Sequence, residues 1–192
     1  VLLLHGPRGA GKTHLAHLWR DRAAAILLAG AALDQTRLRE AIDSAGPRIA
    51  VDDADRAPEA ALLHLYNASL EAGGSLLLTS RHAPGPWRPA LADLGSRLRA
   101  APAVGIDLPD DSLLAAVLAK HFADRQVRVA PEVILFLVRH MERSLAAAGE
   151  IAAALDHAAL SGRAAITIPL ANRVLAVATD HGFSAGSDAG VT

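Results

Sequence analysis

The 192-residue chain contains no cysteine, which excludes disulfide bonds, thiolate catalysis and zinc sites of the cysteine type. Aromatic residues make up only 3% of it, so few rings are available for stacking nucleic-acid bases. The formal charge is -1, from 19 basic and 20 acidic residues, which removes the bulk electrostatic attraction of most nucleic-acid-binding proteins. We therefore expect no direct sequence-specific DNA binding.

Long hydrophobic runs are also missing. The longest apolar stretch, Ala23 to Leu33, is shorter than the roughly 20 residues that a membrane-spanning helix needs, and no secretory signal opens the chain. These features predict a soluble, cytoplasmic protein without a membrane partner. Because Val1 already lies in a predicted strand, we expect that the chain is a fragment of a protein with a longer N-terminus.

The hydrophobic residues that are present, 52% of the chain, form short runs separated by helix-length segments. These runs are apolar almost throughout, as in strands whose two faces are both covered by helices. The alternation predicts an α/β fold with a parallel five-stranded sheet and right-handed crossovers. The predicted strands are Val1–His5, Ile26–Ala29, Arg48–Asp52, Ser75–Thr79 and Ala103–Asp107.

After the fifth strand the pattern changes to successive amphipathic helices, interrupted at Pro131, Ser144 and Gly162. This part predicts a small all-helical lid domain. The end of the chain, rich in Gly, Ser and Ala, predicts disorder. The predicted parts are a nucleotide-binding α/β domain over residues 1–107, a helical lid domain over 108–179 and a flexible tail over 180–192.

A glycine-rich loop with Walker A spacing lies between the first strand and a helix. In such a loop backbone N–H groups surround the phosphates of ATP or ADP, Lys12 reaches the β- and γ-phosphates, and Thr13 binds Mg²⁺. A glycine-rich turn without a ligand is the weaker alternative. The candidate nucleotide-binding residues are Gly6, Pro7, Arg8, Gly9, Ala10, Gly11, Lys12, Thr13 and His14.

A Walker B pattern follows, in which the apolar strand Arg48–Asp52 ends in paired acids. Asp52 would bind Mg²⁺ directly or through water, and Asp53 would orient or deprotonate the attacking water. Acids at such a place also serve as turn residues or helix N-caps, a role that Asp55 could fill here.

These motifs together resemble the AAA+ module of the DnaA replication-initiator family. The resemblance is carried by Gly11–His17, Val51–Asp53, Leu78–Ser80 and Gly95–Arg97, and it extends to Val177. Because Met141–Leu145 in the lid matches it and no helix-turn-helix DNA-reading domain is seen after the lid, the chain is most similar to the Hda group of this family. That resemblance implies a negative regulator that promotes ATP hydrolysis by DnaA.

The resemblance also implies a role for Arg97 and two partners. Arg97 matches the family's arginine finger, which reaches a neighbouring subunit's γ-phosphate; the alternative is one more solvated arginine. The partners would be the DnaA initiator and the sliding clamp of the replicative polymerase, the latter bound through an N-terminal peptide that this chain lacks. Self-association into a homo-oligomer stays open.

Two positions depart from the family pattern. Arg81 stands where an acidic or amide sensor is usual, which leaves Thr79 and Ser80 as polar stand-ins, and Gly149 stands where the lid usually presents a sensor arginine. Arg143 and Arg139 are weaker candidates for that arginine. Weak or absent intrinsic ATPase activity is therefore expected.

Two further functions remain possible from the sequence. Intact Walker motifs permit an autonomous ATPase, and an initiator or loader fragment without its DNA-binding parts would look the same. His14 and His17, three residues apart, could bind a metal, although a packing surface is the more common reason for such a pair.

Overall fold

The computed structural model describes residues 1–34, 36, 39, 41–42, 48–162 and 164–182. The chain divides between Leu108 and Pro109 into two compact units, and each is described by itself. In the described part of the chain, no helix combines the length and the hydrophobicity that crossing a lipid bilayer requires.

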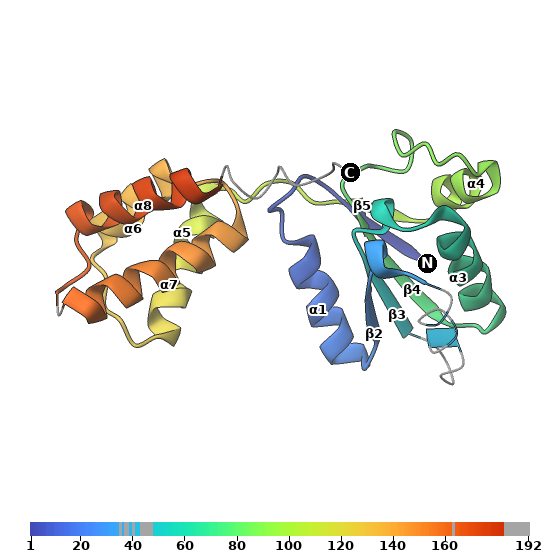
Figure 1. Ribbon diagram of the computed structural model, residues 1–192, viewed down its shortest axis with the longest axis horizontal. Coiled ribbons are helices and arrows are strands. Elements are labelled where there is room, and N and C mark those ends of the chain that lie inside the picture. Colours follow the sequence, from blue (N-terminus) through green and yellow to red (C-terminus); the bar gives the residue numbers. More distant parts are fainter. Residues whose placement is uncertain (35, 37–38, 40, 43–47, 163, 183–192) are drawn as a thin grey trace, which may run out of the picture. The chain divides into compact units, whose positions relative to one another are not determined.

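The first unit is built on a five-stranded sheet with the order β2-β3-β4-β1-β5 (Figure 1). Every neighbouring pair of strands is parallel, which confirms the predicted α/β fold. β1 lies between β4 and β5, so the loop after β1 leaves the sheet beside the ends of both. The strands are β1 (Leu2–His5), β2 (Ile26–Ala29), β3 (Arg48–Asp52), β4 (Ser75–Ser80) and β5 (Ala103–Gly105).

The strand bounds differ from the prediction mainly at β5, which ends at Gly105 and not at Asp107. β5 is an edge strand with β1 as its one neighbour. Within the described part of the chain, a hydrogen bond from the Ile106 N–H to the His5 carbonyl oxygen at 2.7 Å continues the ladder by one step. Beyond that bond nothing in β1 remains for the segment to pair with, because His5 is the last residue of that strand.

Helices cover both faces of this sheet: α1 (Lys12–Ala23) lies on one, and α3 (Glu59–Glu71) and α4 (Ala92–Ala100) lie on the other (Figure 1). Successive strand residues face opposite layers. Leu3 and Leu78 belong to the large core that includes α3 and α4, whereas Leu4 and Leu77 pack in a smaller cluster with Ala16 of α1. Burial on both faces explains why the strands are apolar throughout.

The second unit consists of four helices around one core, as predicted for the lid. They are α5 (Asp111–Asp124), α6 (Pro131–His140), α7 (Leu145–Gly162) and α8 (Ile168–Gly182). The three predicted interruptions are all found, since Pro131 begins α6, Ser144 precedes α7, and α7 ends at Gly162. The core residues with the least exposure are Leu114, Leu118, Leu137, Ala148, Ala152, Leu155 and Ala171, each 0% exposed.

The C-terminal helix is longer than the sequence suggested. α8 continues to Gly182, so residues 180–182, assigned above to a flexible tail, are helical. No proline or glycine interrupts the helix between Ala171 and this glycine, which is a residue type that commonly ends helices. The rest of the predicted tail, residues 183–192, lies outside the described residues.

Candidate functional site

The loop between β1 and α1 turns through three glycines with positive φ angles: 155° at Gly6, 83° at Gly9 and 95° at Gly11. A residue with a Cβ would be strained in these conformations. Gly11 is the N-cap of α1, and among the described residues no side chain caps this helix and no carboxylate lies in its first turn. The unpaired N–H groups and the positive end of the helix dipole are therefore available to an anion.

Steric contact with Ile106, the residue after β5, fixes the start of this loop. A Cβ on Gly6 would lie 2.1 Å from the backbone oxygen of Ile106, so only glycine fits there. The Gly6 N–H donates to the Ser80 carbonyl oxygen at 3.2 Å. The loop thus begins between the ends of β4 and β5, where ligands of open parallel sheets bind.

Lys12 is only 6% exposed and folds back over the loop. Its Nζ donates to the carbonyl oxygens of Gly6 and Pro7, both at 2.8 Å. Burial lowers the pKa of Lys12 below 10.5; Asp53 and Asp52 oppose that change, whereas the positive Arg81 adds to it. A polyphosphate would supply the negative charge that this ammonium group lacks, so the loop fits such a ligand.

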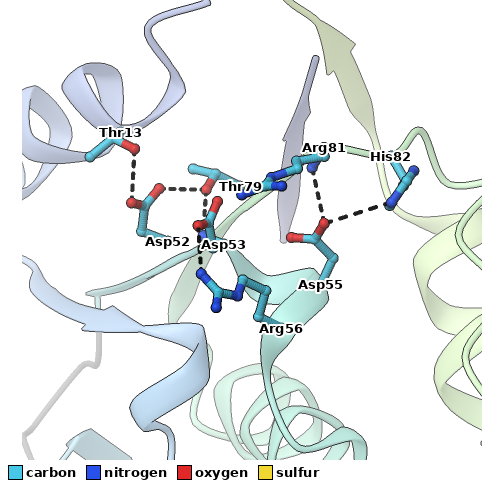
Figure 2. A network of polar contacts seen from close by, with 8 residues as sticks. All are labelled: Thr13, Asp52, Asp53, Asp55, Arg56, Thr79, Arg81 and His82. Carbon is cyan, nitrogen blue, oxygen red and sulfur yellow. Dashed lines mark hydrogen bonds and ion pairs between the residues drawn. The ribbon is translucent and has the colours of Figure 1, made fainter. Parts of the chain in front are cut away.

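A chain of hydrogen bonds connects the loop to the acidic end of β3 (Figure 2). The Thr13 hydroxyl donates to Asp52 Oδ2 at 2.8 Å, and the Thr79 hydroxyl donates to Asp52 Oδ1 at 2.6 Å. Thr79 Oγ1 in turn accepts the Asp53 N–H at 2.9 Å. Thr79, which the sequence offered only as one of two polar stand-ins, is therefore the residue of β4 that orients Asp52.

Asp53 lies at the same end of the sheet in a strained conformation. Its φ and ψ are 49° and 50°, in the left-handed region, which non-glycine residues adopt mainly where function or packing requires it. Its Oδ2 is 4.0 Å from Nη1 of Arg56, a pair in which both side chains are at least 36% exposed. The carboxylate is thus accessible and only weakly held.

Gly30, the residue directly after β2, also contacts this acidic end, a role that was not predicted from the sequence. It is the first residue of the short helix η1 (Gly30–Ala32), and a Cβ there would lie 2.2 Å from the backbone oxygen of Asp53. The only signal in the sequence was a glycine directly after a predicted strand.

Asp55 holds the ends of β3 and β4 together. It lies in the short helix η2 (Ala54–Arg56), and its side chain is 9% exposed. Its Oδ2 accepts the Arg81 N–H at 3.4 Å and lies 4.0 Å from Nε2 of His82 (Figure 2). Asp55 is not a helix cap, because the N-cap of α3 is Pro58 and no side chain caps that helix within the described part of the chain.

Arg97 lies near the C-terminal end of α4 and is 36% exposed. Its Nε is 3.4 Å from Oδ2 of Asp93, one turn earlier in the helix. The guanidinium carbon lies 5.8 Å from the centroid of the Tyr66 ring, a cation–π distance. The predicted finger is therefore partly exposed and has two partners, of which the sequence analysis anticipated neither.

In the lid, Gly149 and Arg143 both lie beside α5. A Cβ on Gly149 would be 3.4 Å from Nε2 of His121, an ordinary van der Waals contact. Arg143 donates to Asp111 Oδ1 at 2.7 Å and to the Pro109 carbonyl oxygen at 3.2 Å, so its side chain is engaged at the start of α5. Arg139 is exposed in the last turn of α6.

The two histidines of α1 make no metal site. His14 is exposed and His17 is half-buried. Among the described residues no three histidine, aspartate or glutamate side chains gather into a group that could hold a metal ion. A cation bound with a nucleotide would instead meet Thr13 and Asp52, hard oxygen ligands of the kind that Mg²⁺ prefers, together with phosphate oxygens.

Comparison with known protein families shows which proteins the second unit resembles. Residues 110–175 match the family model described as the Hda lid domain. The second unit is thus similar to the lid domain of Hda proteins. The matched segment lies within the second unit and spans parts of all four of its helices. Comparison with curated proteins gives no match.

Solved structures share the fold at low sequence identity. Domain III of the replication initiation protein DnaA from Thermotoga maritima matches 91% of this chain and 82% of its own, with 14% identity and a TM-score of 0.76. The Holliday junction branch migration motor RuvB from Thermotoga maritima matches 92% of this chain with 18% identity and a TM-score of 0.74. This chain spans 61% of that RuvB chain.

Proposed function

We propose that this module is a nucleotide-binding regulator of replication initiation that stimulates ATP hydrolysis by DnaA. The Hda-type lid carries the proposal, because it is the feature that separates this chain from AAA+ proteins in general. The phosphate loop and the partly exposed Arg97 supply the two chemical groups that such a regulator needs.

The module would bind ATP or ADP with Mg²⁺ at the end of the sheet. Lys12 and the unpaired N–H groups at the start of α1 would hold the phosphates, while Thr13 and Asp52 would hold the cation. A bound Mg²⁺ neutralises charge on the phosphate oxygens. Thr79 would orient Asp52 for this role, since its hydroxyl donates to that carboxylate at 2.6 Å.

Arg97 would act outside its own subunit. A guanidinium that reaches the γ-phosphate of a neighbour stabilises the charge that develops during phosphoryl transfer. Its place on an exposed side of α4, and not in the phosphate loop, supports action on a partner. The partner is DnaA, and an N-terminal segment would connect the protein to the polymerase sliding clamp.

An autonomous ATPase is the second candidate, and the exposed Asp53 beside Asp52 favours it. That carboxylate could orient water on a nucleotide bound to the same chain. Steady phosphate release by the purified protein alone, lost in Asp53→Asn, would support this alternative over the regulatory role.

The test is to mix the protein with ATP-loaded DnaA from the same source and measure phosphate release. The wild-type protein should accelerate release. Arg97→Ala should bind nucleotide as tightly as the wild type but lose at least about tenfold of the acceleration. Arg99→Ala, in the exposed residue two positions further on, is the matched control and should accelerate normally. Full acceleration by Arg97→Ala would contradict the proposal.

A further inference from the structure

Three contacts hold Arg97, and they come from two helices. The Asp93 carboxylate is 3.4 Å from its Nε, and the Tyr66 ring centroid is 5.8 Å from its guanidinium carbon. The Tyr66 hydroxyl also donates to the backbone oxygen of Arg97 at 3.3 Å. Within the described residues, no carboxylate pairs with Arg99, which lies on the same helix and is exposed.

The position of Tyr66 is set by the core of the first unit. Tyr66 is 6% exposed and packs in the same cluster as Leu94 and Leu98 of α4. A phenylalanine would fill this space equally well, so packing alone does not require the hydroxyl group. A buried hydroxyl needs a hydrogen-bond partner, and this one takes the backbone of Arg97.

α3 also fixes the start of α4. The two carboxylate oxygens of Glu59 accept the N–H groups of Ala90 and Leu91, at 2.9 and 2.8 Å. These residues immediately precede α4, which begins at Ala92. Glu59 and Tyr66 therefore hold α4 at its start and near its end, so α3 serves as the rigid support for the helix that carries Arg97.

We propose that Tyr66 and Asp93 are positioning residues that hold the Arg97 guanidinium in one orientation for its action on a neighbouring subunit. The inference rests on the proposed role of Arg97. A free arginine side chain samples many rotamers, and ordering it costs entropy when it reaches a phosphate. The Tyr66 ring and the Asp93 carboxylate impose part of that order in advance, on the principle that preorganised groups stabilise a transition state best.

The geometry can be tested without any partner, because Tyr66 is the only tyrosine of the chain. Burial raises the pKa of the Tyr66 phenol and the positive charge of Arg97 lowers it. Titration of tyrosinate absorbance should therefore give a higher pKa for Arg97→Ala than for the wild type, and an unchanged pKa for Arg99→Ala. Replacing Tyr66 with meta-fluorotyrosine, whose phenol ionises at lower pH, allows the same titration under conditions in which the protein stays folded. An unchanged pKa in Arg97→Ala would overturn the proposal.

The functional test uses stimulation of DnaA hydrolysis at saturating and subsaturating protein. Tyr66→Leu and Asp93→Asn should each lower the maximal stimulation about two- to fivefold, as expected for a lost exposed cation–π or ion-pair contact, and leave the half-saturating concentration unchanged. Tyr66→Phe, which keeps the ring, should retain most of the stimulation. Because the Asp93 side chain is 61% exposed, Asp93→Asn should fold normally. It therefore tests the positioning role even if Tyr66→Leu fails to fold.

The two tests separate the possible failures. Wild-type stimulation by Asp93→Asn and Tyr66→Leu, alongside loss in Arg97→Ala, would overturn the positioning role and leave the proposed function intact. Wild-type stimulation by Arg97→Ala would instead contradict the proposed function, and the positioning role with it.

Discussion

Gly6 is the residue where a single methyl group should do the most damage. Its Cβ would lie 2.1 Å from the Ile106 backbone oxygen, and its φ of 155° is rare for other residues. We expect Gly6→Ala to lower the free energy of unfolding by about 3 kcal/mol, the upper part of the usual range for single substitutions, and to abolish nucleotide binding. Denaturant unfolding and nucleotide titration measure the two effects.

Gly85 offers the matched control for this substitution. A Cβ there would meet nothing within 4 Å, and the residue is exposed in a turn. Gly85→Ala should change stability by less than about 0.5 kcal/mol and leave nucleotide binding intact. Equal effects of the two substitutions would show that the contact with Ile106 is not what constrains the loop.

Residues that belong to a short sequence motif could be picked out as site candidates from the sequence. Residues whose contacts are with distant parts of the chain could not. Lys12, Thr13 and Asp52 could be proposed as site residues because each belongs to a loop or strand motif of a few neighbouring positions, and the structure places Thr13 and Asp52 in hydrogen-bond contact. The contacts of Tyr66 and Gly30 depend on residues 31 and 23 positions away in the chain, Arg97 and Asp53, which no local pattern reveals.

Among the elements, the five strands could be predicted closely because each is an apolar run bounded by polar or turn residues. β2 and β3 match their predicted bounds, whereas β5 is shorter because its length depends on where β1 ends. The placement of α4 depends on hydrogen bonds from the N–H groups of Ala90 and Leu91 to Glu59 of α3, more than 30 positions away, which no local pattern reveals.

The start of α5 offers a test at a helix end. Asp110 is its N-cap and accepts the Leu113 N–H at 2.7 Å. This backbone hydrogen bond, with smaller contributions that include Ser112 and Arg143, holds the pKa of Asp110 below 3.8. Since the folded state favours the carboxylate, the stabilisation is complete above pH 3.8 and is lost as the pH falls through the lower folded value.

We therefore expect Asp110→Ala to destabilise the lid at neutral pH. The difference from the wild type should shrink once the carboxylate is protonated. Asp110→Asn is the control, because asparagine caps a helix well without a titrating group. Thermal unfolding at neutral pH and at about pH 3 measures both variants. An Asp110→Ala deficit that stays constant across this range would exclude the carboxylate as its source.

At the scale of the whole molecule, the second unit can be considered as a folding unit, because it has a hydrophobic core of its own. Among the described residues, the buried members of this cluster run from Leu114 to Leu175. We expect residues 109–182 to fold alone into a helical bundle with a cooperative thermal transition, because the main apolar faces of its helices are already covered within the unit. Circular dichroism of this fragment tests the expectation, and a non-cooperative, largely unfolded fragment would contradict it.

The proposed function assigns phosphate binding to the loop after β1 and the action on a partner to Arg97, so the decisive measurement is where a labelled γ-phosphate is cleaved. ATP labelled at that phosphate is loaded on DnaA in one experiment and on this protein in another, and the two proteins are then mixed. We predict that label on DnaA is released faster with the wild-type protein and at the basal rate with Arg97→Ala, whereas label on this protein is released slowly in every mixture. Rapid loss of label from this protein, with no change for the label on DnaA, would contradict the proposed function.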